Sequence, residues 1–424
     1  MARALTPKDA YALMNLLVKQ ATGQTAIAVT DVSSFVSAGE KVLATGTENV
    51  INSLSLILNR TLVATRPYRA RLDLMEQVDT GLYSSRIRKI SYYAKDALPS
   101  GDFNTDLFTN FAPGYTNGQN TQANPTSTKS QWEQHPPIPL EMNFAGSSTW
   151  QDCATMYEDQ LQAAFRGPEE FNRFVSGYLT EHANDIESQR EAWNRMNLLN
   201  KIASVYDMTS VMPGSVINLT AAFNAKFGTS YTSMELRSTY LKEFLEFFVA
   251  TVKTTSRMME HRTAKFHWSP AKTVNGVSYT LLRHTPRDRQ RMYLYSPMFI
   301  DAEAMVLPEI FNDQYLSIDG YQGVDYWQTP DAGASINVTP AVVNTTTGVQ
   351  EAGDPVSTYV VGMITDVDGL MTNFQAEISR STPVEARKGY RNVWTTFLRN
   401  NMCDNTENAV IFIMEDKIIV NPNT

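Results

Sequence analysis

Two long amphipathic helices are the clearest elements in the pattern of hydrophobic and polar positions along the chain. The first begins at Gly167-Pro168-Glu169-Glu170 and continues to near Tyr206, with an apolar face at helical spacing formed by Phe171, Phe174, Tyr178, Ile186, Trp193, Met196, Leu199 and Ile202. Roughly 40 residues at ~1.5 Å each predict a length of about 60 Å. We expect this helix to lie against a sheet, with Phe174, Tyr178, Trp193 and Met196 inward. The second helix begins at the capping box of Thr232 and Glu235 and ends near His261.

The N-terminal segment predicts a helical arm. Thr6-Pro7-Lys8-Asp9 indicates a helix start, with a hydroxyl cap and a proline in the first turn. A second helical stretch follows Asp31, although Gly39 and Gly46 weaken it. We assign residues 1–66 to this arm.

Two strands and a polar extension follow the arm. Apolar residues alternate with polar ones at Leu72 and Leu74, and again from Ile138 to Phe144, which is typical of strands. The segment from Pro99 to Pro137 between them is rich in Asn, Gly, Thr, Ser and Pro and is too polar to form a core. We therefore expect an extension that projects from the body of the protein.

The second half of the chain predicts mainly strands. Short apolar runs separated by turn residues occur at 279–282, 293–295 and 359–364. The last two runs, 409–414 and 418–420, indicate a C-terminal hairpin. Together with the long helices, these runs predict an α+β fold.

Composition excludes several classes of protein. The chain has 424 residues, 42% of them hydrophobic, which is enough to bury at least one core. Its formal net charge is −8, so the chain lacks the overall excess of basic residues expected of a protein that binds nucleic acid through phosphates. Cys153 and Cys403 are expected to be free thiols of a reducing compartment. No export signal or membrane-spanning stretch is visible, so we expect a protein made in the cytoplasm that does not contact a membrane.

Charge is distributed unevenly in the second half. Residues 252–292 contain nine Lys or Arg and two acidic residues, a balance of 9 − 2 = +7, whereas residues 300–375 contain eleven Asp or Glu and no Lys or Arg, a balance of −11. Such segments predict complementary surfaces that meet between neighbouring copies of the chain. Phe266, Trp268 and Tyr279 interleave with the cations as in single-stranded nucleic-acid sites, but their strand positions favour a role in the core.

Candidate chemistry is sparse. Phosphate-binding loops, dinucleotide-binding turns, zinc helices and nucleophile elbows have no matching motif. His261 and His267 have no cysteine at metal spacing, and the calcium-like start Asp366-Val367-Asp368-Gly369 lacks its later ligands. Asp301 and Glu303 could share one side of a strand as an acid/base pair, with a solvated acidic edge as the simpler reading. We predict no catalytic residue, no cofactor and no metal site.

The order of these elements resembles that of the major capsid proteins of tailed bacteriophages, especially those of podophage type, whose shell fold is shared by encapsulins. Asn59-Arg60-Thr61-Leu62-Val63 and the stretch from Asn408 to Met414 are similar in character to the phage examples. The resemblance implies an N-terminal arm, an extended β-hairpin loop, a peripheral domain built on a spine helix, and an axial domain. These parts map onto 1–66, 67–149, 150–231 and 232–400, with 401–424 as a C-terminal β-hairpin returning to the peripheral domain.

This resemblance implies a structural, non-enzymatic function. Hexamers and pentamers of the chain would form an icosahedral shell that contacts packaged double-stranded DNA non-specifically on its inner face. A portal and a separate scaffolding protein are the implied partners, because the arm is too short for a fused scaffolding domain. The implied location is the virion capsid, assembled in the cytoplasm of a bacterial host. An encapsulin-like compartment, or a soluble hydrolase using Asp301 and Glu303, remain as alternatives.

Overall fold

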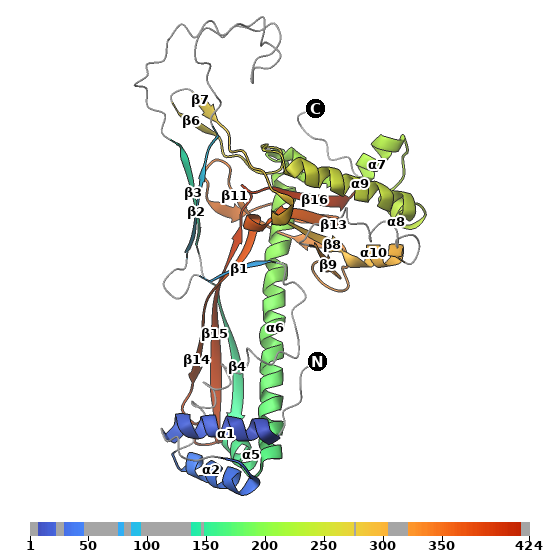
Figure 1. Cartoon of the computed structure of the whole chain (residues 1–424). Helices are drawn as coiled ribbons and strands as arrows, with labels where there is room; N and C mark the ends of the chain where they lie inside the picture. The colour runs from blue at the N-terminus through green and yellow to red at the C-terminus, as the bar shows by residue number, and fades with distance from the viewer. Residues whose placement is uncertain are drawn as a thin grey trace, which may run out of the picture.

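The computed structural model of the chain describes residues 7–22, 29–45, 75–79, 86–94, 137–145, 148–274, 277–303 and 321–416. Several predicted elements lie outside these residues, namely the helical stretch over 50–58, the strand around Leu72, the polar extension over 99–136 and the return strand over 418–420. The described part is an α+β fold, as the sequence predicts. A narrow region of helices and long strands leads to a broader region of mixed sheet and helix (Figure 1).

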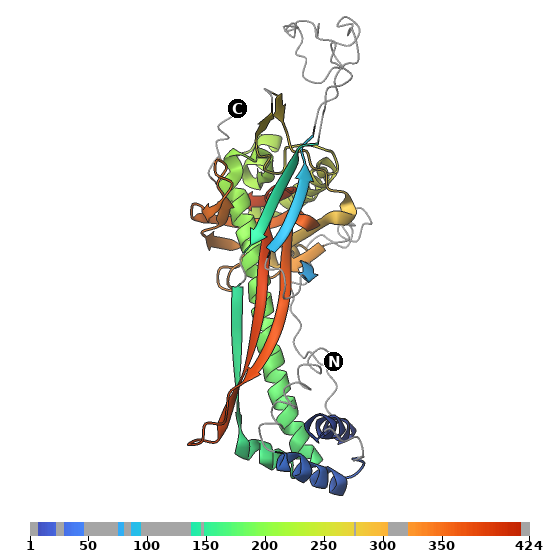
Figure 2. The same ribbon diagram turned by 90° about the vertical axis from the view of Figure 1, so that its left-hand side faces the viewer.

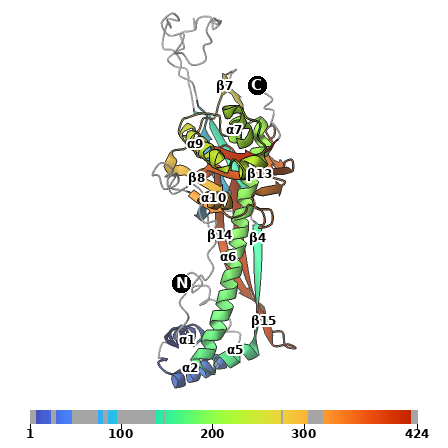
Figure 3. The same ribbon diagram turned by 90° about the vertical axis from the view of Figure 1, so that its right-hand side faces the viewer.

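Helix α6 (Pro168–Asp207, 40 residues) extends through both regions (Figures 1 and 3). Its predicted bounds are confirmed, with Pro168 in the first turn and Glu169 and Glu170 near the positive end of the helix dipole. Of the four residues expected to face inward, Trp193 is buried at 6% exposure and Phe174 is half-buried. Met196 is 48% exposed, so its predicted inward placement is wrong. The side chain of Tyr178 lies outside the described part.

One side of α6 packs on a four-stranded sheet of order β1-β14-β15-β4. Its strands are β1 (Glu76–Asp79), β14 (Leu370–Ser381), β15 (Tyr390–Cys403) and β4 (Ser148–Tyr157). The β14, β15 and β4 strands pair antiparallel, and β1 pairs parallel to β14. Figure 2 shows the long strands of this sheet beside α6. Trp150 of β4 contacts Trp193 of α6 edge to face at 5.4 Å, which joins sheet and helix.

The N-terminal helices close the far end of this narrow region. Helices α1 (Pro7–Thr22), α2 (Val32–Ala44) and α5 (Glu158–Ala164) surround the beginning of α6 (Figure 1). Their shared core contains Met14, Leu17, Phe35, Phe165 and Phe171, all at most 4% exposed. The two predicted helices of the arm are therefore present, and they pack against α5 and α6 of their own chain.

The broader region contains a six-stranded sheet in which β16 is flanked by β5 and β13. Its strands are β5 (Val216–Asn218), β16 (Ala409–Met414), β13 (Val356–Asp366), β8 (Gln290–Tyr295), β9 (Tyr321–Val324) and β10 (Ser335–Val338). One face is covered by α7 (Leu219–Phe227), α8 (Ser233–Ser238) and α9 (Leu241–Met259), and the other by the end of α6. Smaller elements are α10 (Ser296–Glu303), β6 (Lys272–Val274), β7 (Val277–Tyr279), β11 (Ala341–Val343) and β12 (Gln350–Ala352).

The second predicted helix is divided in two. The capping box of Thr232 and Glu235 is present at the start of α8, as predicted. The helix ends at Ser238, and α9 begins after Tyr240, whose backbone leaves the helical region. The Tyr240 ring stacks on Tyr231 at 4.1 Å, so the break places Tyr240 against the preceding loop.

A two-stranded hairpin leaves the body beside the broader region (Figures 1 and 2). It consists of β2 (Arg86–Tyr92) and β3 (Pro139–Ala145), paired antiparallel. The predicted strand from Ile138 to Phe144 is thus present, and residues 93–138 connect the two strands. Ser91 on the inner face is 7% exposed, whereas Ile90 and Tyr92 on the outer face are 49% and 59% exposed.

Replacing Trp193 by Ala tests the packing of α6 on the four-stranded sheet. A large buried aromatic side chain leaves a cavity when it is removed, so the free energy of unfolding should fall by ~3–5 kcal/mol. Met196→Ala, at an exposed position one turn away, is the control and should cost less than about 1 kcal/mol. Chemical denaturation of the isolated subunit measures both, and equal losses would contradict the assigned faces.

Candidate functional site: a buried polar junction

Five consecutive polar residues are buried between β15 and β16. Asp404, Thr406 and Asn408 have no exposed surface, and Asn405 and Glu407 are 3% and 7% exposed. Buried polar groups cost free energy unless they are hydrogen-bonded. This segment, which we call the junction, must therefore find its partners in other elements.

The backbone of the junction is hydrogen-bonded to several distant segments. The Trp268 N–H donates to the Asn405 carbonyl at 2.8 Å, and the Asp366 N–H donates to the Asn408 carbonyl at 2.9 Å. The Asp404 N–H donates to the Gly369 carbonyl at 3.0 Å. The junction is consequently an ordered connection between the two sheets.

Two cations from other parts of the chain reach the junction carboxylates. The Nζ of Lys89 lies 2.6 Å from Asp404 Oδ2 and 2.6 Å from Glu407 Oε1. Arg283 lies 3.1 Å from Glu407, and it also donates to the Thr406 carbonyl and to the Ser91 hydroxyl. Lys89 and Ser91 belong to β2, so these contacts fix the hairpin to the body.

The long helix contributes a lysine with no exposed surface. Lys201 Nζ donates to the Asp404 carbonyl at 2.6 Å and to Asn405 Oδ1 at 3.0 Å. Ser204, one turn further along α6, donates to the same Asn405 oxygen at 3.3 Å. The junction thereby joins α6, the hairpin and both sheets.

Burial and neighbouring charges shift the pKa values of the ionisable groups in opposite directions. Burial lowers the pKa of Lys201 and raises that of Glu407, and the attraction of Lys89 and Arg283 offsets only part of the Glu407 shift. Burial also opposes ionisation of Asp404, but the Lys89 ammonium and Thr406 outweigh it and lower the pKa of Asp404. Both carboxylates contact the Lys89 ammonium at 2.6 Å.

A buried histidine extends this network into the six-stranded region. His267 is 1% exposed, its Nε2 lies 2.8 Å from the Leu281 carbonyl oxygen, and its Nδ1 lies 3.0 Å from Asn408 Oδ1. Asn408 donates to Thr285, whose hydroxyl donates to Asp366 at 2.7 Å. Burial lowers the pKa of His267, which favours the neutral imidazole.

The junction can hold elements together but offers no route to a substrate, because its polar atoms are buried and bonded to one another. Sequence reasoning missed it. One available signal was the polar run Asp404–Asn408 directly before the fully apolar strand β16. Another was the polar stripe of Asn194, Asn197, Lys201 and Ser204 at helical spacing on a buried face of α6.

A second constellation joins α6 to the four-stranded sheet. His182 Nδ1 lies 2.8 Å from Asp152 Oδ2, and its Nε2 lies 3.4 Å from the Thr395 hydroxyl. This order of hydroxyl, imidazole and carboxylate is that of a nucleophilic triad. Thr395 is 1% exposed and His182 7% exposed, so the hydroxyl faces the helix and cannot meet a substrate.

The proposed acid/base pair is not on a strand. Asp301 and Glu303 belong to helix α10, and positions two residues apart on a helix do not share a face. The strand predicted at these residues is wrong. The hydrolase alternative required both carboxylates on one side of that strand, so its geometric basis is lost.

The remaining candidate residues have structural surroundings. No group of three His, Cys, Asp or Glu residues among the described residues could hold a metal ion. Asp366 directly precedes a 3-10 turn that contains Asp368. The Asp366 carboxylate accepts a hydrogen bond from the Asp368 N–H. Phe266 and Trp268 are 3% and 7% exposed, so their predicted role in the core is confirmed, but neither lies on a strand as predicted. Tyr279 ends β7 and is half-buried. No helix of the described part is long and apolar enough to cross a membrane.

No protein-family model and no curated protein sequence matches the chain. Solved structures are similar to it over most of its length. The capsid of Staphylococcus phage Andhra has a TM-score of 0.48 and 10% identity, covering 83% of this chain and 86% of that chain. The capsid of cyanophage P-SCSP1u has a TM-score of 0.43 and 12% identity, covering 84% and 90%. The capsid asymmetric unit of cyanophage Pam1 has a TM-score of 0.40 and 10% identity, covering 85% and 93%.

Replacing Lys89 by Ala tests the ion pairs of the junction. Asp404 and Glu407 would lose a common partner while remaining buried, so the free energy of unfolding should fall by ~3–5 kcal/mol. Arg88→Ala on the same strand is the matched control, because its pair with Glu141 is exposed at 53% and 41% and should contribute less than about 1 kcal/mol. Similar losses in both variants, measured by chemical denaturation, would refute the special role of the buried pair.

The buried His267 predicts a pH dependence of stability. Because its pKa is lowered in the folded chain, the unfolded chain takes up a proton below about pH 6.5 that the folded chain does not. This contribution is fully present above pH 6.5 and is lost as the pH falls, by at most about 1.4 kcal/mol per pH unit. His267→Gln should flatten the dependence of the unfolding free energy between about pH 7 and pH 5. If the unfolding free energy of His267→Gln depends on pH as steeply as that of the wild type, the assignment is contradicted.

Proposed function

We propose that the chain is the major capsid protein of a tailed bacteriophage, a structural subunit of an icosahedral shell around packaged double-stranded DNA. The observation that carries the proposal is the order of the elements along the chain. A helical arm is followed by a hairpin that leaves the body, a 40-residue helix along a four-stranded sheet, and a region of mixed helix and sheet. This is the order that the resemblance to the capsid family implies.

The surface of the hairpin supports a function in assembly. An isolated two-stranded hairpin is marginally stable in water. Here one face is anchored at Lys89 and Ser91, while the outer face exposes Ile90 and Tyr92. A neighbouring subunit would bury these residues, whereas a monomeric enzyme has no use for them.

The finer parts of the proposal concern partners and location. The copies would form hexamers and pentamers, with a portal and a separate scaffolding protein taking part in assembly. Packaged DNA would contact the inner face through its phosphates without sequence preference. Assembly would take place in the cytoplasm of the bacterial host and end in the virion capsid.

Electron microscopy of the full-length chain expressed in bacteria tests this function. Closed shells, or rings and sheets of capsomers, are the expected result. A monodisperse particle with the mass of one chain would overturn the proposal. Shells purified from infected cells should contain DNA, and a cargo enzyme in its place would favour an encapsulin-like compartment.

Deleting residues 117–129 from the polar extension tests its contribution. This segment contains no large apolar residue, so the isolated subunit should keep its fold and its free energy of unfolding to within about 0.5 kcal/mol. Assembly, followed by light scattering, should be impaired because the extension would lose contacts with its neighbour. A deleted chain that no longer folds would show that the extension belongs to the core.

A further inference from the structure

The four-stranded sheet packs on α6 with one face and exposes much of the other. Met156 of β4 and Val393 of β15 belong to the core that also contains Phe171 of α6, so their neighbours along each strand point to the opposite side. We call this side the outer face. It is formed by the odd positions 149–157 of β4 and the even positions 390–398 of β15, with Ile378 and Arg380 of β14. Figure 2 views the sheet from this side, with α6 behind the strands.

The outer face carries almost no charge. Among its positions, all of which the structure describes, Arg380 alone is charged. The other exposed members are threonines, Gln151, Cys153, Tyr157 and Trp394, whereas the aliphatic side chains on this face are half-buried. The exposed surface is therefore made of hydroxyl, amide and aromatic groups together with one thiol.

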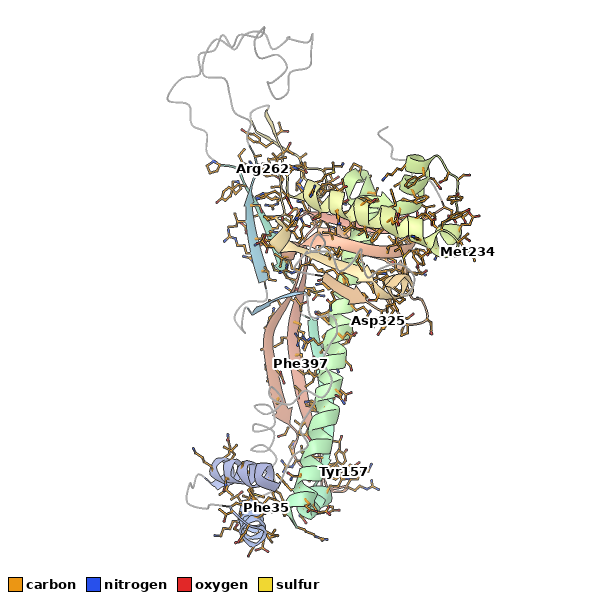
Figure 4. All side chains as sticks on the ribbon, turned by 45° about the vertical axis from the view of Figure 1, so that its right-hand side comes forward. Phe35, Tyr157, Met234, Arg262, Asp325 and Phe397 are labelled. Atoms are coloured by element: carbon orange, nitrogen blue, oxygen red, sulfur yellow. The ribbon has the colours of Figure 1, made fainter. Side chains whose placement is uncertain are left out.

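Aromatic rings are exposed at two places on this face. Tyr157 is 46% exposed and lies 6.0 Å from the ring of Tyr390, its cross-strand partner. Figure 4 shows Tyr157 close to the beginning of α6. Trp394 is 38% exposed and follows Tyr390 by four residues on the same strand, which is ~13 Å at ~3.3 Å per residue. A ligand that contacts both places must be extended.

Polar side chains are ordered on either side of Trp394. The Thr155 hydroxyl donates to Asn392 Oδ1 at 2.8 Å, and Gln151 Nε2 donates to the Thr396 hydroxyl at 3.4 Å. These two cross-strand pairs flank the row in which Trp394 lies opposite Cys153. Because an amide has two donor hydrogens and an oxygen with two lone pairs, both amides keep hydrogen-bonding capacity for a ligand.

This combination of groups favours one class of ligand. A sugar ring has C–H groups on its faces, which stack on aromatic rings, and hydroxyl groups at its rim, which bond to amides and hydroxyls. A nucleic-acid strand also stacks on aromatic rings, but it needs cations along its phosphates, and this face has only Arg380. A second protein copy would need an apolar centre for its interface, and no exposed aliphatic side chain lies here.

We propose that the outer face binds a neutral polysaccharide. Sugar rings stack on Trp394 and on Tyr157, and the hydroxyl groups between them bond to Asn392 and Gln151. The ligand is a chain of sugars because the two aromatic places are farther apart than one ring can reach. The inference goes beyond the proposed function and does not depend on it, since every residue involved belongs to one subunit.

Affinity electrophoresis of the full-length chain tests the binding. Native gels contain hydroxyethyl cellulose, galactomannan or dextran, and at least one of these soluble polysaccharides should retard the wild type. Trp394→Ala and Tyr157→Ala should each weaken the binding about fivefold, because each removes one stacking surface. Trp394→Phe keeps a ring and should retain most of the binding. Tyr92→Ala, at an exposed aromatic residue of the hairpin, is the control and should bind as the wild type does.

Cys153 allows a second, independent measurement. Its thiol is exposed and lies opposite Trp394 in the register of β4 and β15, so a bulky maleimide attached to it should cover the outer face. Retardation should then be lost. Cys153→Ser removes the attachment point while keeping a small polar side chain. This variant should bind before and after maleimide treatment.

Each contrary outcome can be assigned. The proposal is overturned if none of the three gels retards the wild type, or if Trp394→Ala and Tyr157→Ala, folded by circular dichroism, are retarded as much as Tyr92→Ala. Binding that survives maleimide attachment at Cys153 also overturns it. If the wild type is not retarded and the two aromatic variants fail to assemble, the outer face belongs to a contact with a second copy. The polysaccharide proposal is then wrong, while the proposed capsid function stands.

Discussion

Burial of the junction from Asp404 to Asn408 is the constraint on which the rest of the structure depends. Five polar residues without appreciable exposure must be satisfied by hydrogen bonds, and their partners come from α6, the hairpin and the loops around His267 and Arg283. Removing one partner leaves a buried polar group without a hydrogen bond, and its desolvation is then uncompensated. The contacts of the junction therefore depend on one another. The relative placement of the two sheets and the hairpin follows from this network.

This constraint explains how an elongated subunit can keep one shape. The narrow region has its own core around Phe35 and Phe171, and the broader region has cores on both faces of its sheet. Helix α6 joins them physically, and Lys201 fixes its position relative to the junction. The connection therefore holds the hairpin, the helix and both sheets in one relative placement.

Local signals predicted the elements that local chemistry controls. The bounds of α6 and the capping box at Thr232 follow from apolar spacing and from end-capping residues. A sheet beside α6 was predicted, but its strands were not assigned, because the face toward α6 includes Arg391 and Thr395, which conceal the alternation expected of a half-buried strand. The junction was not predicted for a related reason. Asp404–Asn408 has the composition of a surface turn, and its burial depends on Lys89 and Lys201, which are far away in the sequence. Counting charges found the two charged segments, but it could not show that Arg289 already pairs with Asp368 in the same chain.

Native-state hydrogen exchange tests most directly whether the junction constrains the whole subunit. The amides of Asp404, Thr406 and Ala409 donate to Gly369, to the Asp404 carboxylate and to Phe266, all within the folded chain. If the junction is the common connection, these amides should exchange only by global unfolding, with the same opening free energy as the buried turns of α6 around Ile202. Exchange of the junction amides through a local opening, at a free energy well below that of α6, would contradict the account.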